Sequence, residues 1–288
     1  MKTTILSIVM IVLCNTVFSE ITPDKIIDYK SVGDVTLKMS IFNPESHKES
    51  DQKPAIVFFS GGGWVKWSPD QFFRQCEYLA SRGMVAIYAE YRTQNHYGGS
   101  PKECVKDGKS AMRWIRSHAK ELGINPDMIA AGGGSAGGHV AAATATLSGF
   151  NEDGEDTSVS CKPNALVLFN PVFDNSVDGY GYDRVQEYWK EFSPMHNIDE
   201  NTPATIVFLG TKDKLIPVET AEKYKKIMEK AGNRCELFLY KDQTHGFFNH
   251  DRYYETLLEA DKFLTSLGYL KGEPTIKKEN STEQKGQS

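Results

Sequence analysis

A serine flanked by glycines stands between an apolar run and a helical pattern. Gly133, Ser135 and Gly137 form a Gly-x-Ser-x-Gly pattern between the apolar residues 128–131 and the helical pattern of residues 136–147. Glycines make room for a tight strand-to-helix turn, whose strained backbone lifts the serine toward a substrate. Such a serine is typical of a nucleophile for acyl transfer. Two alternatives for the pentapeptide are a flexible loop and a phosphate cradle, but the Lys-Ser or Lys-Thr of a Walker motif is missing.

A serine nucleophile needs a histidine base and a carboxylate that orients it. In folds that carry the serine on such a turn, the three residues occur along the chain in the order Ser, acid, His. Asp213 and His245 each follow an expected strand, and they come after Ser135 in this order. An aspartate in a loop more often caps a helix or turn when it is considered alone. Among the seven histidines the near rival is His250, which lies where the next helix is expected to begin. The sequence therefore predicts a triad of Ser135, Asp213 and His245.

Backbone amides are expected to hold the oxyanion that forms during acyl transfer. The loop after the first expected parallel strand reads Ser-Gly-Gly-Gly-Trp over residues 60–64, and its glycines expose N–H groups. We assign the oxyanion hole to the amides of Gly62, Gly63 and Ala136. The alternative is that these glycines form only a tight turn. The expected pocket wall consists of Trp64, Trp67 and Tyr182; the alternative for one or both tryptophans is a place in the core.

Short apolar runs alternate with amphipathic stretches along the chain, which predicts an α/β fold with a mostly parallel sheet and helices on both faces. The expected strands of the parallel part span residues 55–59, 85–88, 128–131, 165–169, 205–209 and 236–240. The expected helices span residues 69–82, 101–122, 136–147, 217–231 and 253–267. Residues 26–29 and 35–41 are expected to form an antiparallel N-terminal hairpin at the sheet edge.

Three segments stand apart from this pattern. Residues 1–19 have a charged start, a short apolar run and small residues near Ser19, which predicts a signal peptide and a secreted or periplasmic protein. An uncleaved membrane anchor is less favoured because the run is too short to span a bilayer. Residues 172–203 form a long insertion within the expected catalytic domain of residues 20–270, suited to a lid or pocket wall. The polar residues 271–288 are expected to be disordered.

Composition limits the choice of partners and cofactors. The net charge of −5 gives no basic excess for nucleic acid. No stretch predicts a membrane span, and no residue cluster has metal-ligand spacing, so neither a metal nor another cofactor is expected. Without the signal peptide four cysteines remain, at positions 76, 104, 161 and 235; disulfides and buried free thiols are both open. The sequence carries no signal for the oligomeric state.

These motifs together resemble the α/β-hydrolase esterases of the hormone-sensitive-lipase and carbohydrate-esterase kind, close to bacterial acetyl xylan and feruloyl esterases. The resemblance covers about residues 26–270 and includes the serine motif, the glycine loop and the segments around Asp213 and His245. Two positions depart from it. Family members usually carry His where this chain has Ser60, and Asp where it has Gly134.

The resemblance implies a serine esterase acting on short acyl esters, chiefly acetyl esters, carried by a small molecule or by plant or algal oligosaccharide fragments. Two other functions stay open. One is a serine peptidase or amidase, such as a formamidase. The other is an inactive fold that binds a carbohydrate or a protein partner, since a motif does not show geometry.

Overall fold

The computed structural model describes residues 20–278 of the 288-residue chain. The expected signal peptide, residues 1–19, lies outside the described residues. The strands of one sheet, in chain order, are β1 (Lys25–Val32), β2 (Val35–Phe42), β3 (Lys53–Phe59), β4 (Val85–Ala89), β5 (Ile124–Gly134), β6 (Ala165–Phe169), β7 (Ala204–Gly210) and β8 (Cys235–Tyr240). Every expected strand is therefore present, and β5 is longer than its apolar run.

The sheet has the strand order β1-β2-β4-β3-β5-β6-β7-β8. Strands β1 and β2 pair antiparallel, β2 also pairs antiparallel with β4, and all pairs from β4 to β8 are parallel. The N-terminal hairpin thus sits at one edge of a parallel sheet, as predicted. Because the carboxyl ends of parallel strands share one edge, the loops after β3, β5, β6, β7 and β8 are brought together there.

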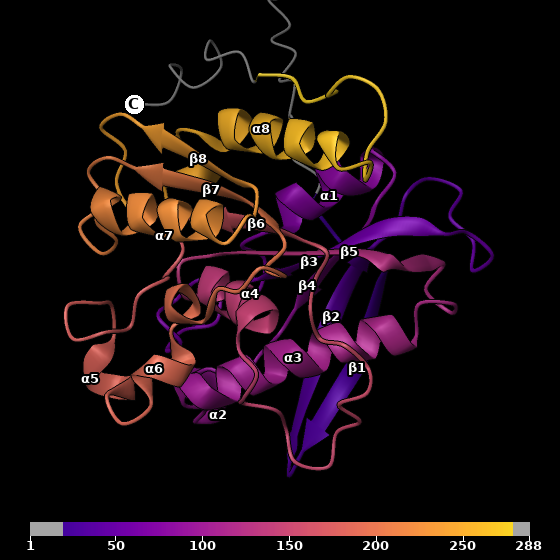
Figure 1. The fold of residues 1–288 in the computed structure, drawn as a ribbon. Helices are drawn as coiled ribbons and strands as arrows, with labels where there is room; N and C mark the ends of the chain where they lie inside the picture. The colour runs from indigo at the N-terminus through magenta and orange to yellow at the C-terminus, as the bar shows by residue number, and fades with distance from the viewer. Residues whose placement is uncertain (1–19, 279–288) are drawn as a thin grey trace, which may run out of the picture.

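Helices cover both faces of this sheet (Figure 1). Their bounds are α1 (Phe73–Ser81), α2 (Gln94–Tyr97), α3 (Pro101–Ser117), α4 (Ala136–Thr146), α5 (Tyr182–Val185), α6 (Trp189–Phe192), η1 (Pro194–Asn197), α7 (Val218–Lys230), η2 (Phe247–Asn249) and α8 (Tyr253–Ser266). Alternate residues of β3 face opposite sides: Val57 packs in the core with α3, α4 and α7, and Phe58 packs with α1 and α8.

Helix ends differ from the expected ranges for local reasons. Helix α3 begins at Pro101 as expected, because Ser100 and Glu103 form a capping box around its first turn. It ends at Ser117, since the chain then turns through Gly123 (φ 59°) into β5. The short helices α2, α5 and α6 were not predicted, because four residues are too few to show a helical period.

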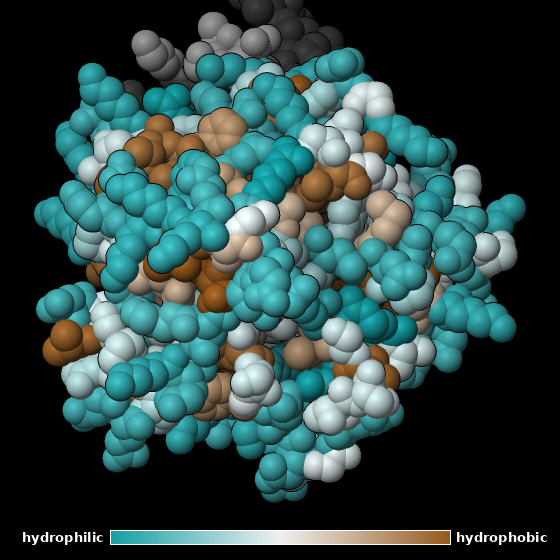
Figure 2. All heavy atoms as spheres, viewed as in Figure 1, coloured by the Kyte–Doolittle hydropathy of each residue, from teal (hydrophilic) through white to brown (hydrophobic). Residues whose placement is uncertain are grey.

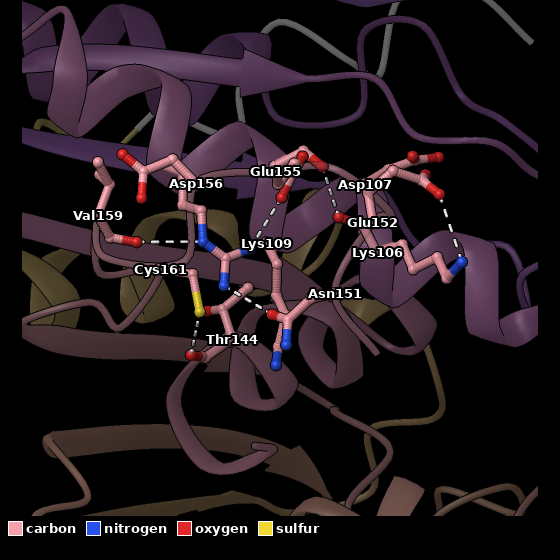
Figure 3. A network of polar contacts seen from close by, with 12 residues as sticks. Lys106, Asp107, Lys109, Thr144, Asn151, Glu152, Glu155, Asp156, Val159 and Cys161 are labelled. Carbon is pink, nitrogen blue, oxygen red and sulfur yellow. Dashed lines mark hydrogen bonds and ion pairs between the residues drawn. The ribbon is translucent and has the colours of Figure 1, made fainter. Parts of the chain in front are cut away.

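Ion pairs hold the loop between α4 and β6 against α3 (Figure 3). Lys106 Nζ lies 3.3 Å from Glu152 Oε1, and Arg113 Nη1 lies 2.9 Å from Glu155 Oε2. On the same helix the buried carboxylate of Asp107 accepts two hydrogen bonds of 2.8 Å from the Arg92 guanidinium. Removing one partner from such a buried pair costs about 3–5 kcal/mol, so this cluster fixes α3 on the sheet.

The face shown in Figure 2 is largely hydrophilic, with apolar residues in small separate groups. Within residues 20–278 no helix is long and apolar enough to cross a bilayer.

Residues 271–278, the described part of the tail expected to be disordered, form neither helix nor strand. Arg82 nevertheless donates hydrogen bonds to the carbonyls of Lys271 and Gly272, at 3.1 and 3.2 Å.

The four cysteines that the structure describes are all free thiols. Burial raises the pKa of Cys76 and of Cys104 well above the ordinary value of a thiol. Both therefore stay protonated and act as small apolar side chains in the core. Of the two alternatives left open by the sequence, the structure has free thiols, buried at Cys76, Cys104 and Cys235 and partly exposed at Cys161.

Candidate active site

Ser135 occupies a strained turn between β5 and α4. Its backbone angles are φ 52° and ψ −118°, and its amide donates a hydrogen bond of 2.9 Å to the carbonyl of Phe169 on β6. Gly137 lets the first turn of α4 approach β3, because a Cβ there would lie 2.1 Å from the carbonyl oxygen of Phe59. The turn therefore presents Ser135 at the carboxyl edge of the sheet, where the Gly-x-Ser-x-Gly pattern predicts it.

Asp213 and His245 are joined by a short hydrogen bond. His245 Nδ1 lies 2.7 Å from Asp213 Oδ2, and the other carboxylate oxygen accepts bonds from the amides of Leu215 (2.8 Å) and Ile216 (3.0 Å). The Asp213 side chain has no exposed surface, whereas the imidazole is 23% exposed. One carboxylate oxygen thus holds the imidazole while two amides fix the other, and the imidazole itself is accessible to a ligand.

Asn170 contacts the same histidine and was not predicted from the sequence. It follows β6 with φ 35°, and its Nδ2 lies 3.4 Å from His245 Nε2. Its Oδ1 accepts a hydrogen bond of 3.0 Å from the amide of Gly246. A polar residue directly after the apolar run 165–169 was the available signal, since ligands bind at the carboxyl ends of such strands.

The glycine loop after β3 forms another side of the site. Gly62 has φ 132°, and a Cβ there would lie 2.2 Å from the carbonyl oxygen of Lys66, so no other residue fits this turn. The Gln71 side chain accepts a hydrogen bond of 2.6 Å from the Gly61 amide, and Tyr91 Oη donates one of 2.6 Å to the Ser60 carbonyl. These two side chains hold the loop in place without the histidine that relatives usually carry at position 60.

The amides predicted for the oxyanion hole lie on the two segments that meet at Ser135. Gly62 and Gly63 are on the glycine loop, and Ala136 is the first residue of α4. Across residues 20–278, none of these three N–H groups donates to another protein group. Of the three, Gly62 and Gly63 line the active-site cavity, whereas Ala136 is buried directly after Ser135.

These segments enclose a cavity of about 430 Å³ at the sheet edge. Ser135 and His245 both line it, together with Gly61, Gly62, Gly63, Val65, Lys66, Gln71, Gly134, Asn170, Tyr180, Arg184, Leu215, Gly246 and Phe248. No hydrogen bond joins Ser135 Oγ to the His245 imidazole within the described chain, but both residues line this one cavity. Nor does that part of the chain contain a group of three His, Cys, Asp or Glu side chains suited to a metal ion.

The structure corrects the expected pocket wall, because Trp64, Trp67 and Tyr182 do not line the cavity. Trp64 has φ 60° and turns inward, where it is 1% exposed and packs edge-on against His139. Trp67 stacks on Tyr88. The expectation that these tryptophans face the substrate is thus wrong: Trp64 is buried in the core, and Trp67 is partly buried against it.

Two other residues of the insertion take the place of Tyr182 on the wall. The chain turns at Gly181 (φ 75°), so Tyr180 before the turn and Arg184 after it line the cavity. The insertion of residues 172–203 therefore contributes two residues to the lining of the cavity.

The surroundings of residue 134 explain why this chain has glycine there, where family members usually carry aspartate. A Cβ on Gly134 would lie 2.7 Å from Cζ of Phe248. The Phe248 ring packs among Phe72 and Phe169, with ring centroids 5.4 and 4.9 Å away. An aromatic group therefore fills the space where relatives usually carry an aspartate.

Comparison with known proteins agrees with this fold and site. The BD-FAE family model matches residues 39–181, and the model of the dienelactone hydrolase family matches residues 165–271. Solved structures of Thermogutta terrifontis esterase 2 superpose on the chain with a TM-score of 0.84. The form phosphoramylated by tabun is 44% identical and the propionate-bound form 43%, each covering 88% of this chain and 98% of the other. The chain belongs to the α/β-hydrolase esterases, which are carboxylic ester hydrolases of the serine hydrolase class.

Among curated proteins, the acetylxylan esterase of Xylanibacter ruminicola is 28% identical over 219 residues, which is 69% of this chain and 42% of that protein. The chain spans about half the length of the first curated relatives that it matches. The recognition of the family and the fold class predicted from the sequence are both confirmed by these comparisons.

Proposed function

We propose that this chain is a serine carboxylesterase that hydrolyses short acyl esters, chiefly acetyl esters, through Ser135, His245 and Asp213. One observation carries the proposal: the imidazole held by buried Asp213 at 2.7 Å opens into the same cavity as the strained Ser135. A nucleophile, a base and an orienting carboxylate in one water-accessible cavity are what acyl transfer requires.

In the proposed reaction, His245 Nε2 takes the proton of Ser135 Oγ as this oxygen attacks the ester carbonyl. The negative charge moves to the carbonyl oxygen, which accepts hydrogen bonds from the amides of Gly62, Gly63 and Ala136. His245 then gives its proton to the departing alkoxide, and an acyl-enzyme remains on Ser135. Water, deprotonated by the same imidazole, releases the acid. Each step uses only groups of this chain.

The short acyl group is supported by similarity. Structures of the Thermogutta esterase are described as propionate-bound and butyrate-bound, and a curated relative is named acetylxylan esterase. Phe248 also supports a short acyl group, because this aromatic side chain lies against Gly134 beside the nucleophile and lines the cavity.

The test is hydrolysis of p-nitrophenyl esters from acetate to decanoate by the wild type and by Ser135→Ala, Asp213→Asn and, as a matched control, Ser117→Ala on the exposed end of α3. We expect acetate to be turned over fastest. S135A should lose at least about 10³-fold and D213N about 10⁴-fold in kcat, because the asparagine favours the wrong imidazole tautomer. S117A should match the wild type.

Two outcomes would overturn the proposal. Rates for the wild type and S135A that both equal the uncatalysed background would exclude Ser135 as the nucleophile and leave an inactive binding protein. Labelling of Ser135 by a fluorophosphonate without ester turnover would favour a peptidase or amidase. If neither outcome occurs, release of acetate from acetylated xylo-oligosaccharides tests the carbohydrate substrate.

We also propose that the protein is exported, on the basis of the signal-like sequence of residues 1–19. N-terminal sequencing of protein from the culture medium and the periplasmic fraction tests this. A new terminus near residue 20 is expected. A chain found only in the cytoplasm, with Met1 retained, would contradict export.

A further inference from the structure

The substrate cavity carries positive charge without a matching carboxylate. Lys66 and Arg184 line it, and no Asp or Glu is among the lining residues. This contrasts with the chain as a whole, whose net charge is −5. The nearby Asp213 carboxylate has no exposed surface and is occupied by His245 and two amides, so it does not face a ligand. The lining of the cavity therefore carries two cations and no carboxylate, which the overall composition does not predict.

Arg184 is held in place by neutral groups. Its Nη1 donates a hydrogen bond of 2.6 Å to the carbonyl of Gly63, and its guanidinium lies 4.9 Å from the Trp64 ring and 5.4 Å from the Tyr180 ring. In residues 20–278 no carboxylate forms an ion pair with Arg184 or with Lys66. One carbonyl uses only one of the five N–H groups of a guanidinium.

A half-buried guanidinium without a counter-charge is a recognition element for an anion. It forms strong, often bidentate, hydrogen bonds with a carboxylate or a related group. The ammonium of Lys66 is exposed at the same cavity and adds attraction over a longer range. Before reaction, a neutral acetyl ester offers neither cation an anionic partner, whereas an ester with a carboxylate can bind both.

We propose that this site selects esters that carry a negative charge, with a carboxylate on the substrate facing Arg184 and Lys66. The inference rests on the proposed esterase function and narrows its substrate class. The charge can belong to the alcohol part, as in an acidic sugar, or to the acyl part, as in a half-ester of a dicarboxylic acid. Both offer the same carboxylate to the same two cations, and the test separates them.

Two substrate pairs measure the preference. For charge on the alcohol part, 4-acetoxyphenylacetate is compared with its methyl ester, which has a similar leaving group. For charge on the acyl part, the mono-4-nitrophenyl ester of adipic acid is compared with its methyl ester. Within each pair the quantity of interest is the ratio of kcat/KM for the anionic ester to that for the neutral ester.

The variants remove one positive charge at a time. Lys66→Met removes the exposed cation of the cavity, and Lys226→Met is the matched control, since Lys226 is an exposed lysine of α7 outside the cavity. Arg184→Met removes the guanidinium, and Arg184→Lys keeps the charge while it loses the planar group that bonds Gly63. Comparison of the last two separates charge recognition from support of the glycine loop.

For at least one pair we expect a ratio of about ten in the wild type at low salt, falling about threefold in K66M and about tenfold in R184M. R184K should retain most of the ratio, even where it slows both esters. Added NaCl should lower the ratio in the wild type. K226M should leave it unchanged.

A ratio that is the same in the wild type, K66M, R184M and K226M for both pairs would overturn the inference. So would equal losses for anionic and neutral esters in R184M, because these would show that Arg184 does not select for charge on the substrate. Failure of the esterase proposal has a different signature: no Ser135-dependent hydrolysis of either member of either pair.

Discussion

The side-chain amide of Asn170 fixes the tautomer of His245. The Gly246 amide can only donate, so the atom it meets at 3.0 Å is the oxygen of Asn170, and Nδ2 faces the imidazole 3.4 Å away. An amide nitrogen also only donates, so His245 Nε2 accepts this bond. The imidazole proton therefore resides on Nδ1, toward Asp213. This is the tautomer that a general base for Ser135 requires.

Asn170→Asp should shift the pH profile of the enzyme. A carboxylate at this place gives the protonated imidazole an ion-pair partner, and proton uptake at His245 then competes with its role as a base. We expect the acid limb of the kcat/KM profile for p-nitrophenyl acetate to move to higher pH by about one unit relative to the wild type. Rates at pH 5 to 9 measure it.

Asn170→Ala is the matched control. It removes the hydrogen bonds to Gly246 and His245 but adds no charge, so it should lower kcat while the acid limb stays in place. Equal displacement of the limb in both variants would show that the asparagine acts through the fold of the loop rather than through the charge state of the imidazole.

Most of the fold could be predicted from the sequence because its strands are continuous apolar runs separated by amphipathic helices. Ser135, Asp213 and His245 follow from a glycine motif in a strand-to-helix context and from chain order. Asn170 was missed because one asparagine after a strand belongs to no motif. Trp64 was misplaced because its inward turn depends on φ angles within the folded glycine loop, and no side-chain pattern reports those.

Gly134 and Phe248 should be energetically coupled. An alanine at position 134 would place its Cβ 2.7 Å from Cζ of Phe248, a ring already packed by Phe72 and Phe169. We expect Gly134→Ala to lower the free energy of unfolding by about 1–3 kcal/mol. In a Phe248→Leu background the same change should cost about 1 kcal/mol less. Urea unfolding of the wild type, both single variants and the double variant gives the coupling.

Gly149→Ala provides the control, since a Cβ there meets nothing within 4 Å, and its effect should be small. If the Gly134 and Phe248 effects simply add, the contact with Phe248 is not what requires glycine at position 134. The absence of the aspartate usual in relatives would then need another cause.

His139 is neutral inside the core and should make the fold sensitive to acid. Burial lowers its pKa to about 3, and its Nε2 bonds the Phe192 carbonyl at 3.1 Å while Trp64 packs edge-on against its ring. The same histidine in the unfolded chain takes up a proton below about pH 6.5. Between pH 6.5 and 3 the unfolded state thus binds more protons, and the free energy of unfolding falls as the pH falls.

The slope from one such group is about 1.4 kcal/mol per pH unit. His139→Gln can still donate to the Phe192 carbonyl but does not titrate, so it isolates this term from the carboxylates that both proteins share. Between pH 7.5 and 4.5 the wild type should lose about 2–3 kcal/mol more than H139Q in urea unfolding followed by tryptophan fluorescence. Equal losses of unfolding free energy in the wild type and H139Q would mean that His139 takes up its proton in the folded state, so that the core around Trp64 admits water. Because Trp64 adjoins the glycine loop, that result would also make the oxyanion site responsive to acid.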